Sequence, residues 1–72
     1  MSADYAQRLV TMANQIATAF DGQRGDAAHE TANHIKLFWS PPMLRQIRLH
    51  LEHGGEGLTP TARQALAEVA AG

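Results

Sequence analysis

The stretch HIKLFWSPPML (residues 34–44) contains both the end of one helix and the start of the next. Proline disfavours the helical conformation in the residue before it, whereas its own fixed φ suits the first turn of a helix. Ser40 is therefore the expected N-cap of a helix that begins at Pro41, and the preceding helix must end by Trp39. This boundary predicts two separate helices in the middle of the chain.

Upstream of the boundary, apolar residues recur at steps of three and four, the period of an amphipathic helix, in two segments. The first spans residues 5–20, with Ser2 as its expected N-cap and Gly22 as a left-handed residue that stops it. The second follows a loop over residues 21–25 and begins after Asp26, a favourable N-cap. The predicted apolar faces are Tyr5, Leu9, Met12, Ala13, Ile16 and Phe20, and then Ala28, Ala32, Ile35 and Trp39.

Downstream of the boundary, a third helix is predicted over residues 41–53 and ends where His53 is followed by a glycine-rich loop, residues 54–57. Thr59 and Pro60 are the expected N-cap and first residue of a fourth helix. No segment alternates polar and apolar residues as a strand does. The sequence therefore predicts an all-α fold, a small bundle of about four short helices. The two apolar faces are Met43, Leu44, Ile47 and Leu51, and then Leu58, Ala62, Ala65, Leu66 and Val69.

Chain length and composition predict one domain, residues 1–72, with a thin hydrophobic core. Thirteen of its apolar residues are alanines, while a large apolar side chain contributes roughly 1.5–3 kcal/mol when it is buried. Small domains compensate with disulfides, a structural metal or association with another chain. Because the chain has no cysteine, association with a partner is the favoured solution.

The charge pattern argues against nucleic acid and membranes as partners. Six basic and seven acidic residues give a net charge of -1, without a basic stripe. No apolar run is long enough to span a bilayer, and the N-terminal residues do not resemble a signal peptide. We therefore expect a cytoplasmic protein.

Histidines are the only side chains in the sequence with an obvious capacity for metal binding. His50 and His53 have i,i+3 spacing on one helix, but no further ligand motif accompanies them. We expect no metal site, with His53 interacting with carbonyl groups at its helix C-terminus and with His29 and His34 facing solvent or a partner. No nucleophile motif or phosphate-binding loop is present either, so the sequence predicts no catalytic residue and no cofactor-binding residue.

Two leucines lie outside the predicted apolar faces. Leu37 shares a helix face with polar residues of its own helix, and Leu49 lies beside Arg45 and Glu52. Together with Phe38, they could form a patch that binds another protein, because large apolar side chains dominate interface energetics. Trp39 is favoured as a core residue, but the helix face that carries it is included in the predicted docking surface. The complete predicted docking set is Leu37, Phe38, Trp39, Met43, Arg45 and Leu49.

Four motifs occur in a characteristic order along the chain. These are MANQIA (residues 12–17), HIKLFW (residues 34–39) followed by a proline and Met43, HL before GG (residues 50–55), and GLTP (residues 57–60) followed by Arg63. In this order and spacing the chain resembles the delta subunit of NAD-dependent, molybdenum-containing formate dehydrogenases. The resemblance covers the chain from Leu9 to Leu66.

This resemblance implies a small subunit without a redox centre that supports assembly or stability of the complex, including retention of the molybdenum cofactor. The implied partners are a large alpha subunit, which bears molybdenum bis-guanine-dinucleotide and iron–sulfur clusters, and beta and gamma subunits with FMN and further clusters, which deliver electrons to NAD. The family usually has Phe-Trp-Asp-Pro-Arg-Met, where this chain has Ser40 and Pro42 in place of the acid and the arginine. If that arginine contacts a partner in the family, this chain would make the corresponding contact through Arg45 or Lys36.

Two other classes of function are compatible with the sequence. One is a small helical regulator that binds nucleic acid through Lys36, Arg45 and Arg48, and the other is a metal-binding domain that uses His34, His50 and His53. Sequence alone does not distinguish a permanent subunit from a transient assembly factor, and it does not identify the partner's surface.

Overall fold

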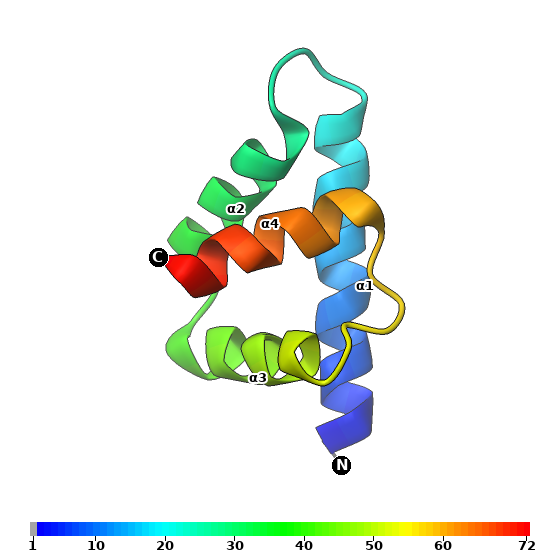
Figure 1. The fold of residues 1–72 in the computed structure, drawn as a ribbon, viewed down its shortest axis with the longest axis vertical. Helices are drawn as coiled ribbons and strands as arrows, with labels where there is room; N and C mark the ends of the chain where they lie inside the picture. Colours follow the sequence, from blue (N-terminus) through cyan, green and yellow to red (C-terminus); the bar gives the residue numbers. More distant parts are fainter. Residues whose placement is uncertain (1) are drawn as a thin grey trace.

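In a computed structural model, the backbone is described for residues 2–72 and the side chains for residues 4–72. This part of the chain forms four helices and no strand, which confirms the predicted all-α fold (Figure 1). The helices are α1 (Ser2–Asp21), α2 (Ala27–Phe38), α3 (Pro41–Glu52) and α4 (Pro60–Ala71). None of them is long and apolar enough to cross a membrane.

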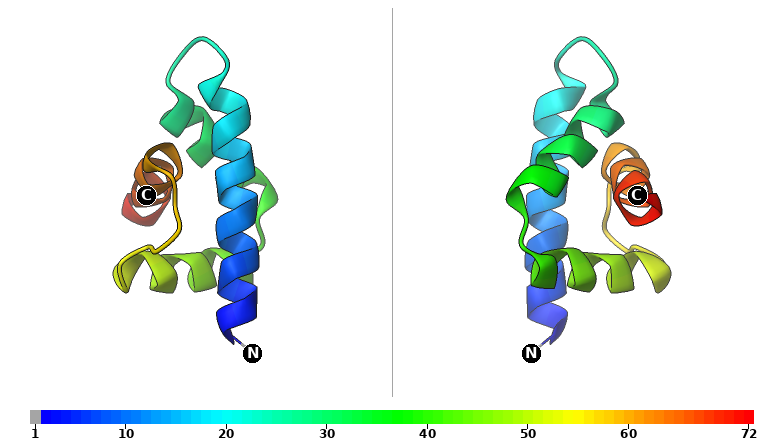
Figure 2. Two further views of the ribbon diagram at one scale, coloured as in Figure 1. Left: turned by 90° about the vertical axis from the view of Figure 1, so that its right-hand side faces the viewer. Right: turned by 90° about the vertical axis from the view of Figure 1, so that its left-hand side faces the viewer.

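The longest helix, α1, extends along the length of the molecule, and the other three helices pack against it or against each other (Figures 1 and 2). α2 and α4 pack on one another and both contact α1. α3 packs against α1 and α4, but within the described residues no Cα atom of α3 lies within 8 Å of a Cα atom of α2 three or more positions away. The two helices that flank Trp39 and Ser40 therefore diverge instead of forming a hairpin.

Most of the core lies between α1, α2 and α4. The predicted apolar faces of α2 and α4 are entirely buried, which confirms both predictions. Alanines from all three helices are completely buried, and such small side chains let helix axes approach closely. By contrast, only Ile47 of α3 is buried. These alanines are Ala13, Ala17, Ala32, Ala62 and Ala65, each 0% exposed.

Side-chain capping matches the prediction at two of three helix starts. Asp26 accepts a hydrogen bond from the His29 backbone N–H at 3.1 Å, and the Thr59 hydroxyl accepts one from the Ala62 N–H at 3.2 Å. Both bonds satisfy donors that a helix N-terminus otherwise leaves without a partner. Ser40 occupies the N-cap position of α3 as predicted, but its side chain makes no capping hydrogen bond.

The predicted ends of α1 need correction. The helix ends at Asp21, but Gly22 does not adopt a positive φ and is therefore not a left-handed stop. The chain instead continues through a turn in which the Gln23 N–H donates to the Phe20 carbonyl at 3.0 Å, and Gly25 supplies the positive φ of 108°. At the other end, α1 begins at Ser2, three residues before the predicted start at Tyr5. The Ser2 side chain, which was predicted to cap the helix, lies outside the described side chains.

Candidate functional site

Large apolar side chains are exposed at the C-terminal end of α2. Leu37 is 77% exposed and Phe38 is 70% exposed, whereas the adjacent Trp39 is only 6% exposed and belongs to the core. Successive residues of a helix point about 100° apart, which follows from 3.6 residues per turn and explains this abrupt change. The preference for Trp39 as a core residue is confirmed. Its burial leaves it little surface to offer to a partner.

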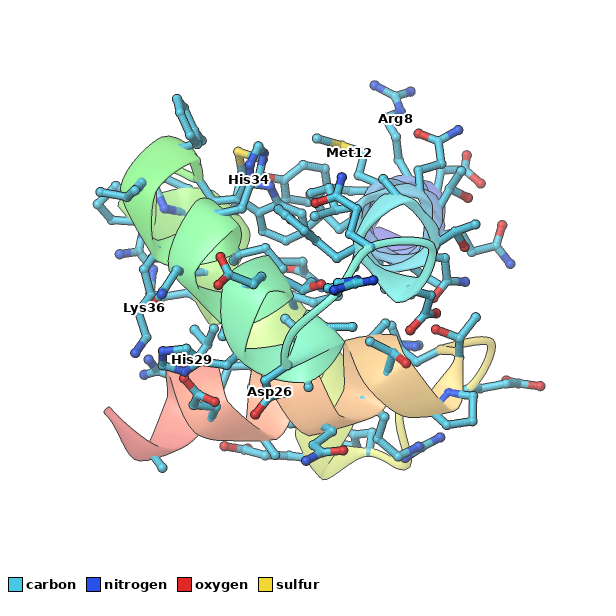
Figure 3. All side chains as sticks on the ribbon, turned by 90° about the horizontal axis from the view of Figure 1, so that it is seen from above. Arg8, Met12, Asp26, His29, His34 and Lys36 are labelled. Carbon is cyan, nitrogen blue, oxygen red and sulfur yellow. The ribbon has the colours of Figure 1, made fainter. Side chains whose placement is uncertain are left out.

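Three aromatic rings form a row across the surface between α1 and α2. The His34 ring lies 4.6 Å from the Phe38 ring and 6.4 Å from the Phe20 ring, measured between centroids. Figure 3 shows His34 and Met12 projecting to the same side of the molecule, away from α4. We call this surface the α1–α2 face and define it as Met12, Phe20, His34 and Phe38. We assign Leu37 to it as well, because Leu37 is the exposed sequence neighbour of Phe38.

Polar contacts are concentrated on the other flank of α2, which faces α4. The His29 Nδ1 atom donates to the Glu68 carboxylate at 2.8 Å, although the His29 side chain is 53% exposed. Lys36 lies on the same flank, beside the end of α4 (Figure 3). The prediction that His29 faces solvent or a partner therefore missed its bond to α4. The flank of α2 that carries His29 and Lys36 therefore contacts α4, whereas α4 does not cover the α1–α2 face.

The remaining predicted docking residues lie on α3. Arg45 and Leu49 are exposed and Met43 is half-buried. Leu49 is about 12 Å along this helix from Pro41, at 1.5 Å per residue. That Leu37, Phe38 and Leu49 form a single patch stays a prediction.

The glycine-rich loop between α3 and α4 is held by side chains from three helices. Four successive carbonyl groups, from Gly54 to Gly57, each accept a side-chain hydrogen bond, a feature that the sequence analysis missed when it treated this loop as a helix breaker. Arg63 donates to Gly54 at 2.9 Å and to Gly55 at 3.0 Å, His50 Nε2 donates to Glu56 at 2.8 Å, and Asn14 Nδ2 donates to Gly57 at 2.9 Å. We call these three side chains the loop clamp.

Asn14 makes a second bond within the clamp, because its Oδ1 atom accepts from the Thr59 N–H at 3.0 Å. An aspartate here would keep the acceptor but place a carboxylate oxygen against the Gly57 carbonyl. We expect Asn14→Asp to lower the free energy of unfolding by about 0.5–1.5 kcal/mol, the usual net contribution of one hydrogen bond, because the Asn14–Gly57 bond is exposed to solvent. Urea unfolding followed by circular dichroism measures this value.

The matched control is Gln15→Glu, the same chemical change at an exposed neighbouring position. It should alter the free energy of unfolding by no more than about 0.5 kcal/mol, as surface substitutions usually do. Equal losses in the two variants would contradict the structural role assigned to Asn14.

The remaining histidines are engaged separately. His53 Nδ1 donates to the Leu49 carbonyl at 2.8 Å, which confirms its predicted interaction with the C-terminal carbonyls of α3. His50 belongs to the loop clamp, and His34 to the aromatic row. Among the described residues, no group of three histidine or acidic side chains is placed to hold a metal ion.

The cations considered for nucleic-acid binding come from two helices. Lys36 lies on the α4 side of α2, whereas Arg45 and Arg48 are exposed on α3.

Fold and surface together define a small all-helical protein with an open apolar face. A family model with the description NADH-dependant formate dehydrogenase delta subunit FdsD matches residues 8–66. The chain belongs to this family, as the ordered motifs of the sequence indicate. Comparison with curated proteins and with solved structures gives no match.

Proposed function

We propose that this chain is a non-catalytic accessory subunit of a cytoplasmic NAD-dependent formate dehydrogenase, and that it docks on the alpha subunit through the α1–α2 face. Docking would support assembly of the complex, its stability or retention of its molybdenum cofactor. The observation that carries the proposal is the exposure of Leu37 and Phe38, which are 77% and 70% exposed, in a chain of the delta-subunit family.

The physical support for this surface comes from the clustering of its residues. Scattered single apolar side chains are ordinary on protein surfaces, but adjacent ones indicate an interaction site. Here Leu37 and Phe38 are neighbours, and Phe38 continues into the row formed with His34 and Phe20. Burying one such side chain contributes roughly 1.5–3 kcal/mol, so a partner that covers both would gain substantial affinity.

In this proposal the redox groups belong to the other subunits. The molybdenum bis-guanine-dinucleotide and iron–sulfur clusters would lie in the alpha subunit, with FMN and further clusters in the beta and gamma subunits. This chain has no cysteine and therefore offers no thiolate for an iron–sulfur cluster. It would act on cofactor retention only indirectly, by stabilising the conformation of the alpha subunit that it contacts.

Deletion of this chain in its host tests the proposal. The tagged alpha subunit is purified from the deletion strain and compared with wild type for bound molybdenum, subunit composition and formate-dependent NAD reduction. We expect a loss of molybdenum or of other subunits, with restoration when this chain is supplied. A fully loaded and fully active complex without the chain would refute the proposal.

The same preparation distinguishes a permanent subunit from a transient assembly factor. Recovery of this chain at equal stoichiometry with the mature alpha subunit would identify a permanent subunit. Recovery only with the alpha subunit that lacks molybdenum would identify an assembly factor that leaves after cofactor insertion. Either result is compatible with docking through the α1–α2 face.

A further inference from the structure

A pocket of about 380 Å³ lies between the N-terminal half of α1 and the loop that joins α3 to α4. Its volume is at the lower end of the roughly 300–1,000 Å³ typical of ligand pockets. None of its residues belongs to the α1–α2 face. The lining residues are Gln7, Val10, Thr11, His50, Glu56 and Gly57.

The loop wall of this pocket is pre-organised. The loop clamp holds the carbonyls of Glu56 and Gly57 through His50 and Asn14. Both of these bonds are exposed to solvent, so water could have satisfied the carbonyls without fixing the loop. The chain therefore uses side chains from two helices to hold a surface loop in one conformation. A wall fixed in advance reduces the entropy lost when another molecule binds against it.

The polar groups of the pocket favour a cationic occupant. Glu56 is exposed, and its carboxylate makes neither an ion pair nor a hydrogen bond with any described side chain. His50 donates from Nε2, so in the neutral ring Nδ1 is an acceptor, and the amide oxygen of Gln7 is a further acceptor. Val10 adds an apolar surface suited to a methylene stem. An arginine or lysine side chain combines this stem with a charged hydrogen-bond donor.

We propose that this pocket is a second contact site, which receives an arginine or lysine side chain of the alpha subunit with Glu56 as its counter-ion. The inference rests on the proposed function, because it assumes that the chain docks on that subunit. It adds a charged contact, away from the α1–α2 face, to the apolar contact already proposed. Two separate contacts would fix the orientation of this small subunit as well as its affinity.

Charge removal at Glu56 tests the contact. The purified chain is titrated onto the tagged alpha subunit, purified from the deletion strain together with any subunits that remain bound to it, and the dissociation constant is measured by biolayer interferometry. We expect Glu56→Gln to weaken binding about tenfold, a moderate value for an interfacial ion pair, and to reduce the salt dependence of binding. The matched control is Glu52→Gln, an exposed acid on α3 that does not line the pocket, and it should bind like wild type.

Filling the pocket provides an independent test. Thr11→Lys introduces an ammonium group into the pocket, where it would compete with the partner's cation for Glu56, so we expect binding about tenfold weaker or worse. Thr18→Lys makes the same change at an exposed position of α1 outside the pocket and should bind like wild type. Circular dichroism of all four variants checks that their helicity is retained.

The outcomes separate this inference from the proposed function. If the wild-type chain does not bind the purified alpha subunit, the proposed function fails. If the wild-type chain binds while Glu56→Gln and Thr11→Lys bind equally well, docking is supported but the pocket is not the second contact. Loss of binding in the two controls to the same extent as in the pocket variants would also overturn the assignment, because the effect would then be one of net charge.

Discussion

Replacing Leu37 with aspartate is expected to weaken binding of this chain to the alpha subunit about 30-fold or more, corresponding to at least about 2 kcal/mol for a residue that dominates an interface. Leu37 is 77% exposed, so the isolated fold loses little packing when it is replaced. The bound state loses an apolar anchor and must bury a carboxylate. Titration of the variant onto the tagged alpha subunit purified from the deletion strain measures the change in the dissociation constant.

Helix stability is the main alternative explanation for such a loss. Leu37 lies in the last turn of α2, where a negative charge opposes the helix dipole and a positive charge favours it, by about 0.3–1 kcal/mol. Leu37→Lys therefore serves as a second variant that removes the apolar surface without weakening the helix. We expect both variants to lose binding while retaining helicity. A variant that lost helicity but bound normally would contradict the assignment of Leu37.

Leu49→Asp, on α3, makes the same change at the other exposed leucine, which is 49% exposed. Because Leu49 lies on α3 and the α1–α2 face does not include that helix, the comparison shows which helix the partner covers. If only the Leu37 variants lose affinity, the α1–α2 face is the docking surface. If only Leu49→Asp loses affinity, docking occurs through the outer face of α3 and the proposed surface is wrong.

Trp39→Ala is expected to lower the free energy of unfolding by about 3–5 kcal/mol, the usual cost of removing a large aromatic side chain from a core. Trp39 is only 6% exposed and belongs to the main core cluster. Small domains have a total stability of about 5–15 kcal/mol, and nearly half of the buried apolar residues here are alanines. The variant should therefore be partly or fully unfolded at room temperature, as measured by circular dichroism and urea titration.

The adjacent Phe38 provides the matched control, because it is 70% exposed. Phe38→Ala removes an aromatic side chain one residue away and loses its contact with the His34 ring, a pair worth about 0.5–1.5 kcal/mol. We expect this variant to remain folded but to bind the alpha subunit weakly. Equal destabilisation of the two variants would contradict the division of this Phe-Trp pair into one surface residue and one core residue.

The sequence by itself determined the secondary structure and most of its boundaries. The signals that set these boundaries act over only a few residues, so they can be recognised in the sequence alone. They are the helix periodicity, the capping side chains of Asp26 and Thr59, and the prolines at positions 41 and 60. The buried faces of α2 and α4 follow from the same local period. The exposure of Leu37 and Phe38 was also predictable, because each residue's direction on a helix is set by its position in the turn.

Only the tertiary structure decided how the helices and their side chains come together. The Asn14 bonds to the loop join residues 43 and 45 positions apart, and the His29 bond to Glu68 joins residues 39 apart. No local pattern specifies such pairs, since they depend on how helices cross. The same limit applies to Leu49. Its outward direction follows from the helix period, whereas its position relative to Leu37 depends on the angle at which α3 leaves α2.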